Sequence, residues 1–304
     1  MQPVVGRSFV QDSVLLKIGL PIAIAIIMCG IGLTLSGADF RRIGQHPKPV
    51  VVGLIGHYLL LPLLGFAVAW LFPDSLEFAV GFVLVAACPS GSSSNALTFL
   101  ARGNVALAVT LTVISALVTF ISVPLLVNLA LDWFGGETRQ IRLPIGQTVM
   151  HLAALVLVPV LLGMGLRRFA PALAQRIEPW VSRFALLLLL LLIVAISVTQ
   201  HDLLLRTFPE LGPAALLMCS AAIGGGFALA RVSGLGLRDS ITVAMEVGVQ
   251  NSTLAIVIAL TLLNSPQVAV PAAMYGLLMY LPAFAVVMLG RRAVAREQAR
   301  GAVV

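Results

Sequence analysis

The sequence predicts an all-α polytopic membrane protein with nine transmembrane helices arranged as an inverted repeat. Three observations predict this fold: the high apolar content, its division into nine segments, and polar interruptions in two of them. Of the 304 residues, 60% are hydrophobic and 10% are charged, whereas soluble domains average roughly 45–50% apolar and about 25% charged residues. We therefore expect a single transmembrane domain over residues 1–304.

Nine apolar segments are each long enough to cross the hydrocarbon core, which takes about 20 residues in a helix. Helices are expected because they satisfy every backbone polar group internally, where no water is available. The connections are short, so no soluble domain is expected between the segments. The segments span residues 15–36, 49–71, 77–100, 104–130, 145–166, 181–200, 211–232, 239–263 and 268–290.

The formal charge of +7 follows the expected topology rather than a nucleic-acid site. If successive loops alternate sides, the regions after the first, third, fifth, seventh and ninth segments hold 14 of the 19 basic residues. Cytoplasmic loops carry an excess of Lys and Arg, which places the C-terminus inside and the N-terminus outside. Because 17 of the 19 are Arg, we expect a bacterial protein of the inner (plasma) membrane from a GC-rich genome.

Polar residues interrupt the third and eighth segments. The third reads Cys88-Pro89-Ser90-Gly91-Ser92-Ser93-Ser94-Asn95, and the eighth reads Glu246-Val247-Gly248-Val249-Gln250-Asn251-Ser252. Proline removes a backbone donor, and Ser and Asn favour caps and turns over helix interiors. Both segments are therefore predicted to be discontinuous helices.

The two interrupted segments are five spans apart, so they cross the membrane in opposite directions. Each is followed by a span with a proline near its far end, Pro124 and Pro282. Such a pair of interrupted segments is the sequence signature of an inverted repeat with a transport site at its interface. We expect a first repeat over about 15–130, which lacks its opening helix, and a second over about 145–290.

Glu246 is the only acidic residue that lies inside a predicted span and away from its ends. Ionisable residues within membranes usually face a cavity and carry function. No Lys or Arg lies at the middle of a predicted span, so a cation from solution is the expected partner. Interrupted helices supply free carbonyl oxygens for a cation and half-helix N-termini for an anion. The expected oxygen ligands are Ser94, Asn95, Glu246, Gln250 and the carbonyls of Val247 and Val249, and the expected N-termini follow Gly91 and lie near Asn251.

At these residues the sequence resembles the bile acid:sodium symporter family. Three blocks carry the resemblance: residues 30–35 with Asp39-Phe40, residues 88–95 continuing through 100–107, and residues 246–252. Their order and spacing fit over nearly the whole chain. The second and third blocks are specific, whereas the first alone would be weak.

The resemblance implies a core domain, a panel domain and two sodium sites behind the crossing of the discontinuous helices. It assigns Ser94, Asn95, Thr112 and Glu246 to the first sodium. To the second it assigns Glu246, Gln250 and the carbonyls of Val247 and Val249. It places the substrate against Ser92 and Asn251.

Two positions depart from the family pattern. Ala108 replaces a serine hydroxyl at the first site, and Thr110 is a doubtful substitute for it. His57 replaces a glutamine at the second site. The imidazole ring of histidine has an ordinary pKa near 6.5 and can be protonated near neutral pH. A protonated ring could therefore take the place of the second cation. The alternative is that His57 is neutral and bonds a backbone carbonyl.

The predicted function is sodium-coupled symport of a small organic anion, either a metabolite carboxylate or a bile-acid-like molecule, by alternating access. The alternatives are a proton-linked or sodium-independent transporter or exporter on the same fold, and a membrane receptor or scaffold. No enzyme is expected, because Ser92-Ser93-Ser94 lacks a Gly-x-Ser-x-Gly elbow and a nearby His. The expected partners are sodium, the organic anion and membrane lipids, with no nucleic acid. The sequence does not indicate the transport direction or oligomeric state.

Overall fold

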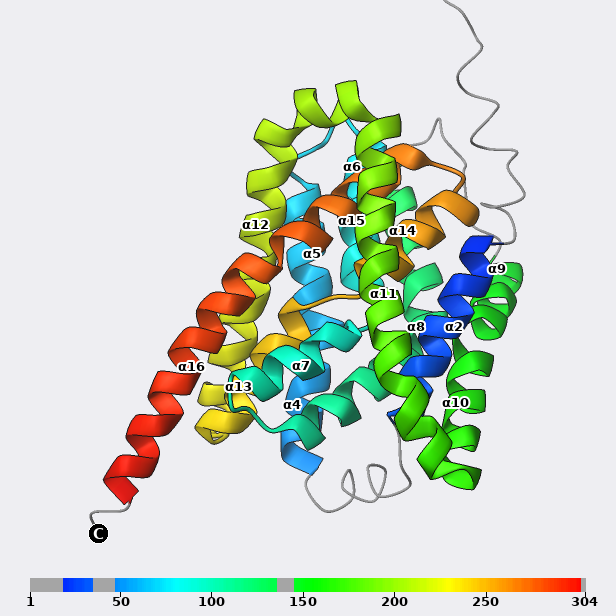
Figure 1. Cartoon of the computed structure of the whole chain (residues 1–304). Coiled ribbons are helices and arrows are strands. Elements are labelled where there is room, and N and C mark those ends of the chain that lie inside the picture. Colours follow the sequence, from blue (N-terminus) through cyan, green and yellow to red (C-terminus); the bar gives the residue numbers. More distant parts are fainter. Residues whose placement is uncertain (1–18, 35–46, 136–144, 302–304) are drawn as a thin grey trace, which may run out of the picture.

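The computed structural model describes residues 19–34, 47–135 and 145–301 (Figure 1). Within these ranges the chain forms helices and short connections, and the only β-type pairing is an isolated bridge between Ser90 and Gln250. The predicted all-α class is confirmed. The Asp39-Phe40 pair and the basic residues Arg41 and Arg42 lie outside the described ranges.

Six helical stretches of the described chain are long and apolar enough to cross a membrane. They are α4–η3–α5 (Pro47–Ala69), α8 (Val105–Gly135), α9–η4–α10 (from Gly146 to Phe169), α11 (Pro171–Thr199), α12 (His201–Val232) and α15–α16 (from Pro266 to Ala299). Five shorter helices complete the fold: α2 (Leu20–Leu33), α6 (Leu76–Ala87), α7 (Ser92–Leu100), α13 (Leu237–Gly248) and α14 (Ser252–Thr261).

Every predicted segment contains helix, but several helices extend beyond the apolar stretch. α11 begins at Pro171, ten residues before the predicted start at 181, and α12 begins at His201 rather than 211. Proline at N1 suits a helix start because its fixed φ is already helical and its missing N–H has no partner there. The apolar content of the sequence predicts where the spans lie. The helix ends depend instead on local residues, such as a proline at the first helical position. The count of nine spans remains a prediction.

The two predicted interruptions are present as short non-helical linkers. One separates α6 from α7 at residues 88–91, and the other separates α13 from α14 at residues 249–251. Cys88 is extended at ψ 158°, because the ring of the following Pro89 disfavours helical backbone at the residue before it. Val249 leaves the helix at φ −104° and ψ 96°.

The two linkers pair with each other through backbone hydrogen bonds. Gly91 N donates to the Val249 carbonyl and Asn251 N donates to the Pro89 carbonyl, both at 2.9 Å. These bonds satisfy groups that would otherwise be unpaired in a region without water. The crossing therefore joins segments 160 residues apart in the chain.

α2 packs closely against α10, and α11 lies beside them (Figure 1). A Cβ added at Gly32 would lie 2.1 Å from the Val160 carbonyl oxygen, and one at Gly163 would lie 2.1 Å from the Cys29 carbonyl oxygen. Only glycine permits this approach, which is typical of tightly packed membrane helices. α2 and α10 are thus in backbone contact.

Candidate functional site

The Glu246 side chain lies where three helices meet behind the crossing. It is on α13 and only 1% exposed. Its Oε1 accepts a short hydrogen bond from Ser94 Oγ of α7, and its Oε2 accepts one from Thr112 Oγ1 of α8 at 2.8 Å. The carboxylate is therefore held from both sides by hydroxyl groups.

Asn95 completes this oxygen cluster. Its Oδ1 lies 3.5 Å from Thr112 Oγ1. The structure thus brings together the four residues predicted for the first sodium, although α13 lies more than 100 residues after α7 and α8 in the sequence. No Lys or Arg of the described residues pairs with the Glu246 carboxylate. The cluster therefore combines a buried acid with neutral oxygen donors and no protein cation.

The residues predicted for the second sodium lie beside the same acid but are less uniform. Gln250 Nε2 donates to the carbonyls of Val247 at 2.8 Å and Glu246 at 3.2 Å, while its buried Oε1 has no partner in the part of the chain that the structure describes. The Val249 carbonyl accepts the bond from Gly91 in the crossing. In this arrangement the Gln250 amide nitrogen lies against the carbonyls that a cation would contact.

His57 lies on the π-helical turn η3 (Gly56–Leu60) and is 4% exposed. Its Nε2 lies 3.2 Å from the Cys88 carbonyl oxygen, and its Nδ1 has no partner among the described residues. A neutral ring that donates from Nε2 satisfies this geometry. The bond to Cys88 is the contact expected if His57 is neutral and bonds a backbone carbonyl.

The loss of a hydroxyl at position 108 is not compensated by Thr110. Ala108 is fully buried and supplies no oxygen. Thr110 Oγ1 instead donates to the Ala106 carbonyl of its own helix at 2.8 Å. The cluster around Glu246 therefore lacks this oxygen ligand.

Three polar residues that were not predicted support the site. Ser90 Oγ donates to the Glu246 carbonyl at 2.7 Å, and Ser90 N donates to Ser115 Oγ at 3.2 Å. Tyr275 OH donates to the Gly248 carbonyl at 2.8 Å. Ser90 stood in the quoted interruption, but nothing in the spacing of Ser115 or Tyr275 distinguishes them from other polar residues in spans.

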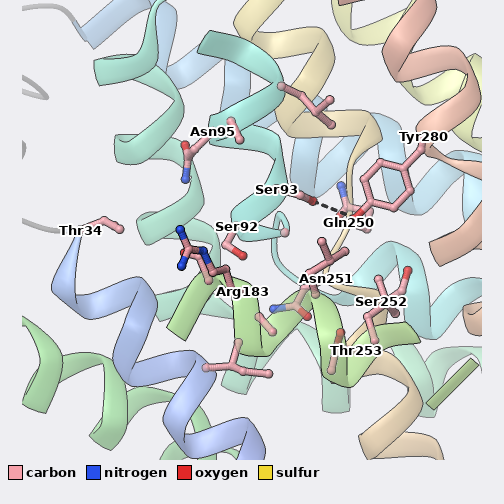
Figure 2. A pocket seen from close by; sticks show the side chains of 18 of the residues that line it. Thr34, Ser92, Ser93, Asn95, Arg183, Gln250, Asn251, Ser252, Thr253 and Tyr280 are labelled. Carbon is pink, nitrogen blue, oxygen red and sulfur yellow. Dashed lines mark hydrogen bonds between the residues drawn. The ribbon is translucent and has the colours of Figure 1, made fainter. Parts of the chain in front are cut away.

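A cavity of about 610 Å³ opens in front of the crossing (Figure 2). Both predicted substrate residues, Ser92 and Asn251, line it. Ser92 is the first residue of α7, and Asn251 caps α14 by accepting from Leu254 N at 3.1 Å. The N–H groups of a first helical turn have no partner within the helix and favour anions.

Arg183 also lines this cavity and points into it (Figure 2). In the sequence, Arg183 lies at the start of the predicted span 181–200, where a basic residue would mark the cytoplasmic end. In the structure it lies within α11, twelve residues after the helix begins at Pro171. The early start of α11 brings Arg183 from the expected membrane boundary into the helix. No pattern in the sequence indicated this placement.

Comparison with known proteins identifies related transporters. The family model described as Sodium Bile acid symporter family matches residues 21–207. A Bacillus subtilis protein, described as the uncharacterized sodium-dependent transporter YocS, is 31% identical over 276 residues, which cover 90% of this chain and 83% of the relative. The human ileal sodium/bile acid cotransporter is 29% identical over 243 residues, covering 80% and 69% of the two chains.

A plant protein is similar over a comparable range. The rice protein described as probable sodium/metabolite cotransporter BASS2, chloroplastic, is 31% identical over 272 residues, which cover 89% of this chain. These residues make up 63% of the plant protein. The names of these relatives describe a sodium-dependent transporter, a sodium/bile acid cotransporter and a sodium/metabolite cotransporter, and none of these names describes an enzyme.

Proposed function

Because this chain belongs to the sodium bile acid symporter family, we propose that it carries a small organic anion across the membrane together with sodium, by alternating access. Its apolar helices and its relatives make it an integral membrane protein of a sodium-coupled transporter family. The substrate class and the transport cycle are our inference from the site.

The observation that carries this proposal is the Glu246 cluster. A carboxylate buried among neutral oxygen donors needs a positive charge, and charged groups within membranes usually pair or line an ion pathway. Sodium is a hard cation suited to carboxylate, hydroxyl and amide oxygens. Ser94, Asn95, Thr112 and Glu246 offer these three oxygen types within one cluster.

Sodium entry would exchange hydrogen bonds for ion contacts. The hydroxyls of Ser94 and Thr112 now donate to the carboxylate, and each also has lone pairs that can face a cation. Rotation of the O–H bonds would turn these hydroxyl lone pairs toward the cation. Together with the Asn95 and Glu246 oxygens, they would then form its ligands. The net charge of the buried cluster would then be neutral.

A second cation position would need the Gln250 amide to turn. Exchange of its Nε2 and Oε1 positions would place the unpartnered Oε1 beside the Val247 carbonyl. Because His57 occupies the neighbouring ligand position of the family pattern and nitrogen suits sodium poorly, we propose that one sodium binds rather than two.

The substrate would bind in the cavity on the other face of the crossing. The half-helix N-termini at Ser92 and near Asn251 attract an anion, and the same linkers position the ligands of Glu246. Sodium and substrate would thus act on one shared backbone unit. This arrangement would couple the two bindings.

The architecture supports a core and a panel domain that move relative to each other. The panel would comprise α2, α9–α10 and α11, and the core the remaining helices. Figure 1 shows α2, α9 and α10 on the right with α11 running from the middle of the view toward them, and the cavity is lined by residues of α2, α11 and the crossing. Nine spans as an incomplete inverted repeat (15–130 and 145–290), within one domain over 1–304, fit this division.

We propose that the protein lies in a bacterial plasma membrane with its N-terminus outside and its C-terminus in the cytoplasm. The positive-inside rule supports this orientation. Apolar side chains on the outer face of α11, such as Leu187, Leu191 and Val194, are 62%, 57% and 60% exposed. Membrane lipids would cover them.

A proton-linked transporter is the second candidate. It is favoured by the missing hydroxyl at Ala108 and by the ring at His57, which together remove two family ligands for sodium. A proton on Glu246 would neutralise the same buried charge. The proposed assignment therefore depends on which cation the cluster binds.

Sodium-dependent thermal stability separates the two candidates. A ligand that binds the native state raises the apparent stability with its concentration. The purified protein should unfold at higher temperature in NaCl than in KCl or choline chloride of equal ionic strength. Equal unfolding temperatures in sodium and potassium would refute sodium coupling. A separate uptake screen of labelled organic acids, with and without sodium, would identify the substrate.

A further inference from the structure

Arg183 is a cation of the cavity without an acidic partner. No carboxylate among the described residues lies within ion-pair distance of its guanidinium. Its Cζ lies 5.2 Å from the centroid of the Trp180 ring. A cation–π contact orients a guanidinium from its face and leaves the N–H donors at its edge free.

The opposite wall of the cavity carries unpartnered polar groups. Ser252 and Gln250 line the cavity, and among the described residues Ser252 Oγ and Gln250 Oε1 are buried without a hydrogen-bond partner. Both residues are only 1% exposed. These polar atoms are covered by the protein, so Arg183 supplies the charged donor of the cavity.

The two walls approach each other close to Arg183. A small second cavity of about 10 Å³ lies between Ser182 and Ala185 of α11 and Ser92 and Asn95 of α7. Arg183 and Ser92 line the same main cavity, and in Figure 2 the Arg183 side chain points toward Ser92. One anionic group could therefore contact both the guanidinium and the N-terminus of α7.

The rest of the cavity is mainly apolar. Its volume of about 610 Å³ compares with about 30 Å³ for one water molecule in the liquid. A three-carbon keto acid would leave most of the apolar wall in contact with water. The apolar lining comprises Ile27, Val109, Leu186, Leu189, Met279 and Phe284.

Glu178 fixes the polarity of the α11 wall. It lines the same cavity, and its Oε1 accepts a hydrogen bond from Ser182 Oγ at 2.8 Å. Its negative charge repels an anion from that part of the wall. Arg183 is thus the position on α11 where an anionic group is favoured.

We propose that Arg183 binds the carboxylate of the transported substrate, and that this substrate carries an apolar body that fills the remaining cavity. The inference rests on the proposed function. It adds a binding residue on α11, opposite the crossing, so that the substrate bridges the two walls. Bidentate contact between Arg and a carboxylate provides both strength and orientation.

The test uses 4-phenylbutyrate and its neutral amide, 4-phenylbutyramide, with purified full-length protein in NaCl. The two probes have nearly the same shape but differ in charge. We expect the carboxylate to bind more tightly than the amide, and pyruvate to bind more weakly than 4-phenylbutyrate. Arg183→Gln should raise the Kd for the carboxylate about ten- to hundredfold, with little change for the amide.

Arg176→Gln is the matched control, because Arg176 is an exposed cation on the same helix that does not line the cavity. It should leave both affinities unchanged. Equal effects of the two Arg variants, or equal losses for carboxylate and amide in Arg183→Gln, would overturn the role of Arg183. Failure of the wild type to bind 4-phenylbutyrate at millimolar concentration would overturn the proposed substrate class.

Sodium-dependent stabilisation measured on the same samples keeps the two proposals apart. Arg183→Gln should retain the sodium response, because Arg183 does not contact the Glu246 cluster. A sodium response in the wild type without carboxylate binding would reject only this inference. Loss of the sodium response in the wild type itself would reject the proposed function.

Discussion

Replacement of Glu246 by Gln tests the charge of the buried cluster while nearly preserving its shape. The carboxylate accepts hydrogen bonds from Ser94 and Thr112, and the amide could keep one of them as an acceptor. At the other position the amide would donate, and the hydroxyl can rotate to accept. We therefore expect a folded protein in which the two bonds are rearranged rather than lost.

The loss of charge should be much larger than the loss of hydrogen bonding. Two unit charges about 4 Å apart interact by about 4 kcal/mol at an effective dielectric constant near 20. Such an energy corresponds to about three orders of magnitude in Kd. By comparison, a hydrogen bond to a charged group exceeds a neutral one by about 1–2 kcal/mol.

The assay is thermal unfolding across a NaCl series at constant ionic strength, with sodium-driven uptake into proteoliposomes as the second readout. Glu246→Gln should show no sodium-dependent shift up to concentrations that saturate the wild type. Glu210→Gln is the control, because it removes an exposed acid on α12. Sodium dependence at the wild-type level in Glu246→Gln would refute the assignment of this carboxylate to the cation.

Three further substitutions test other parts of the site. Asn251→Ala removes a side-chain donor from the cavity and the cap of α14, so it should weaken substrate binding more than sodium binding; equal losses would contradict this division. His57→Gln restores the family ligand and should give a steeper sodium dependence, whereas a sodium titration curve that overlays that of the wild type would make His57 a packing residue. Tyr275→Phe leaves the buried Gly248 carbonyl without its 2.8 Å hydrogen bond and should lower the free energy of unfolding by about 1–3 kcal/mol. Denaturant titration in detergent would measure this loss, with the substitution of an exposed residue, Phe169→Leu, as the control.

The sequence predicted the interruptions because their causes are local. Pro89 and the Ser-rich run after it disfavour a continuous helix wherever the segment lies, and the structure has linkers at both predicted places. Glu246 was identifiable because an acid within an apolar span needs a partner. Ser94 and Asn95 were expected as cation ligands from the interrupted segments, whereas Thr112 was expected only from the family resemblance, since contacts between α7, α8 and α13 depend on tertiary packing.

Other features depend on geometry that the sequence pattern does not encode. The early start of α11 places Arg183 in the cavity, and no local signal fixes that start more closely than the preference of proline for the first turn. The bonds of Ser90 and Ser115 link residues 25 positions apart. The Thr110 hydroxyl turned out to bond its own helix, an option open to any Thr in a helix.

The paired linkers restrict how this chain can change in length. Residues 88–91 and 249–251 are joined backbone to backbone, so side-chain substitutions there leave the pairing bonds in place except at Gly91, where a Cβ would lie 3.0 Å from the Gln250 carbonyl oxygen. Insertion of one residue before Ser92 would instead rotate α7 by about 100° relative to the pairing, because each residue contributes that angle in an α-helix. Ser94 and Asn95 would then turn away from Glu246 while α7 itself stayed intact. Most substitutions in the two linkers are therefore compatible with the ion cluster. An insertion or deletion in one linker would disrupt the cluster unless the other linker changed its pairing register to match.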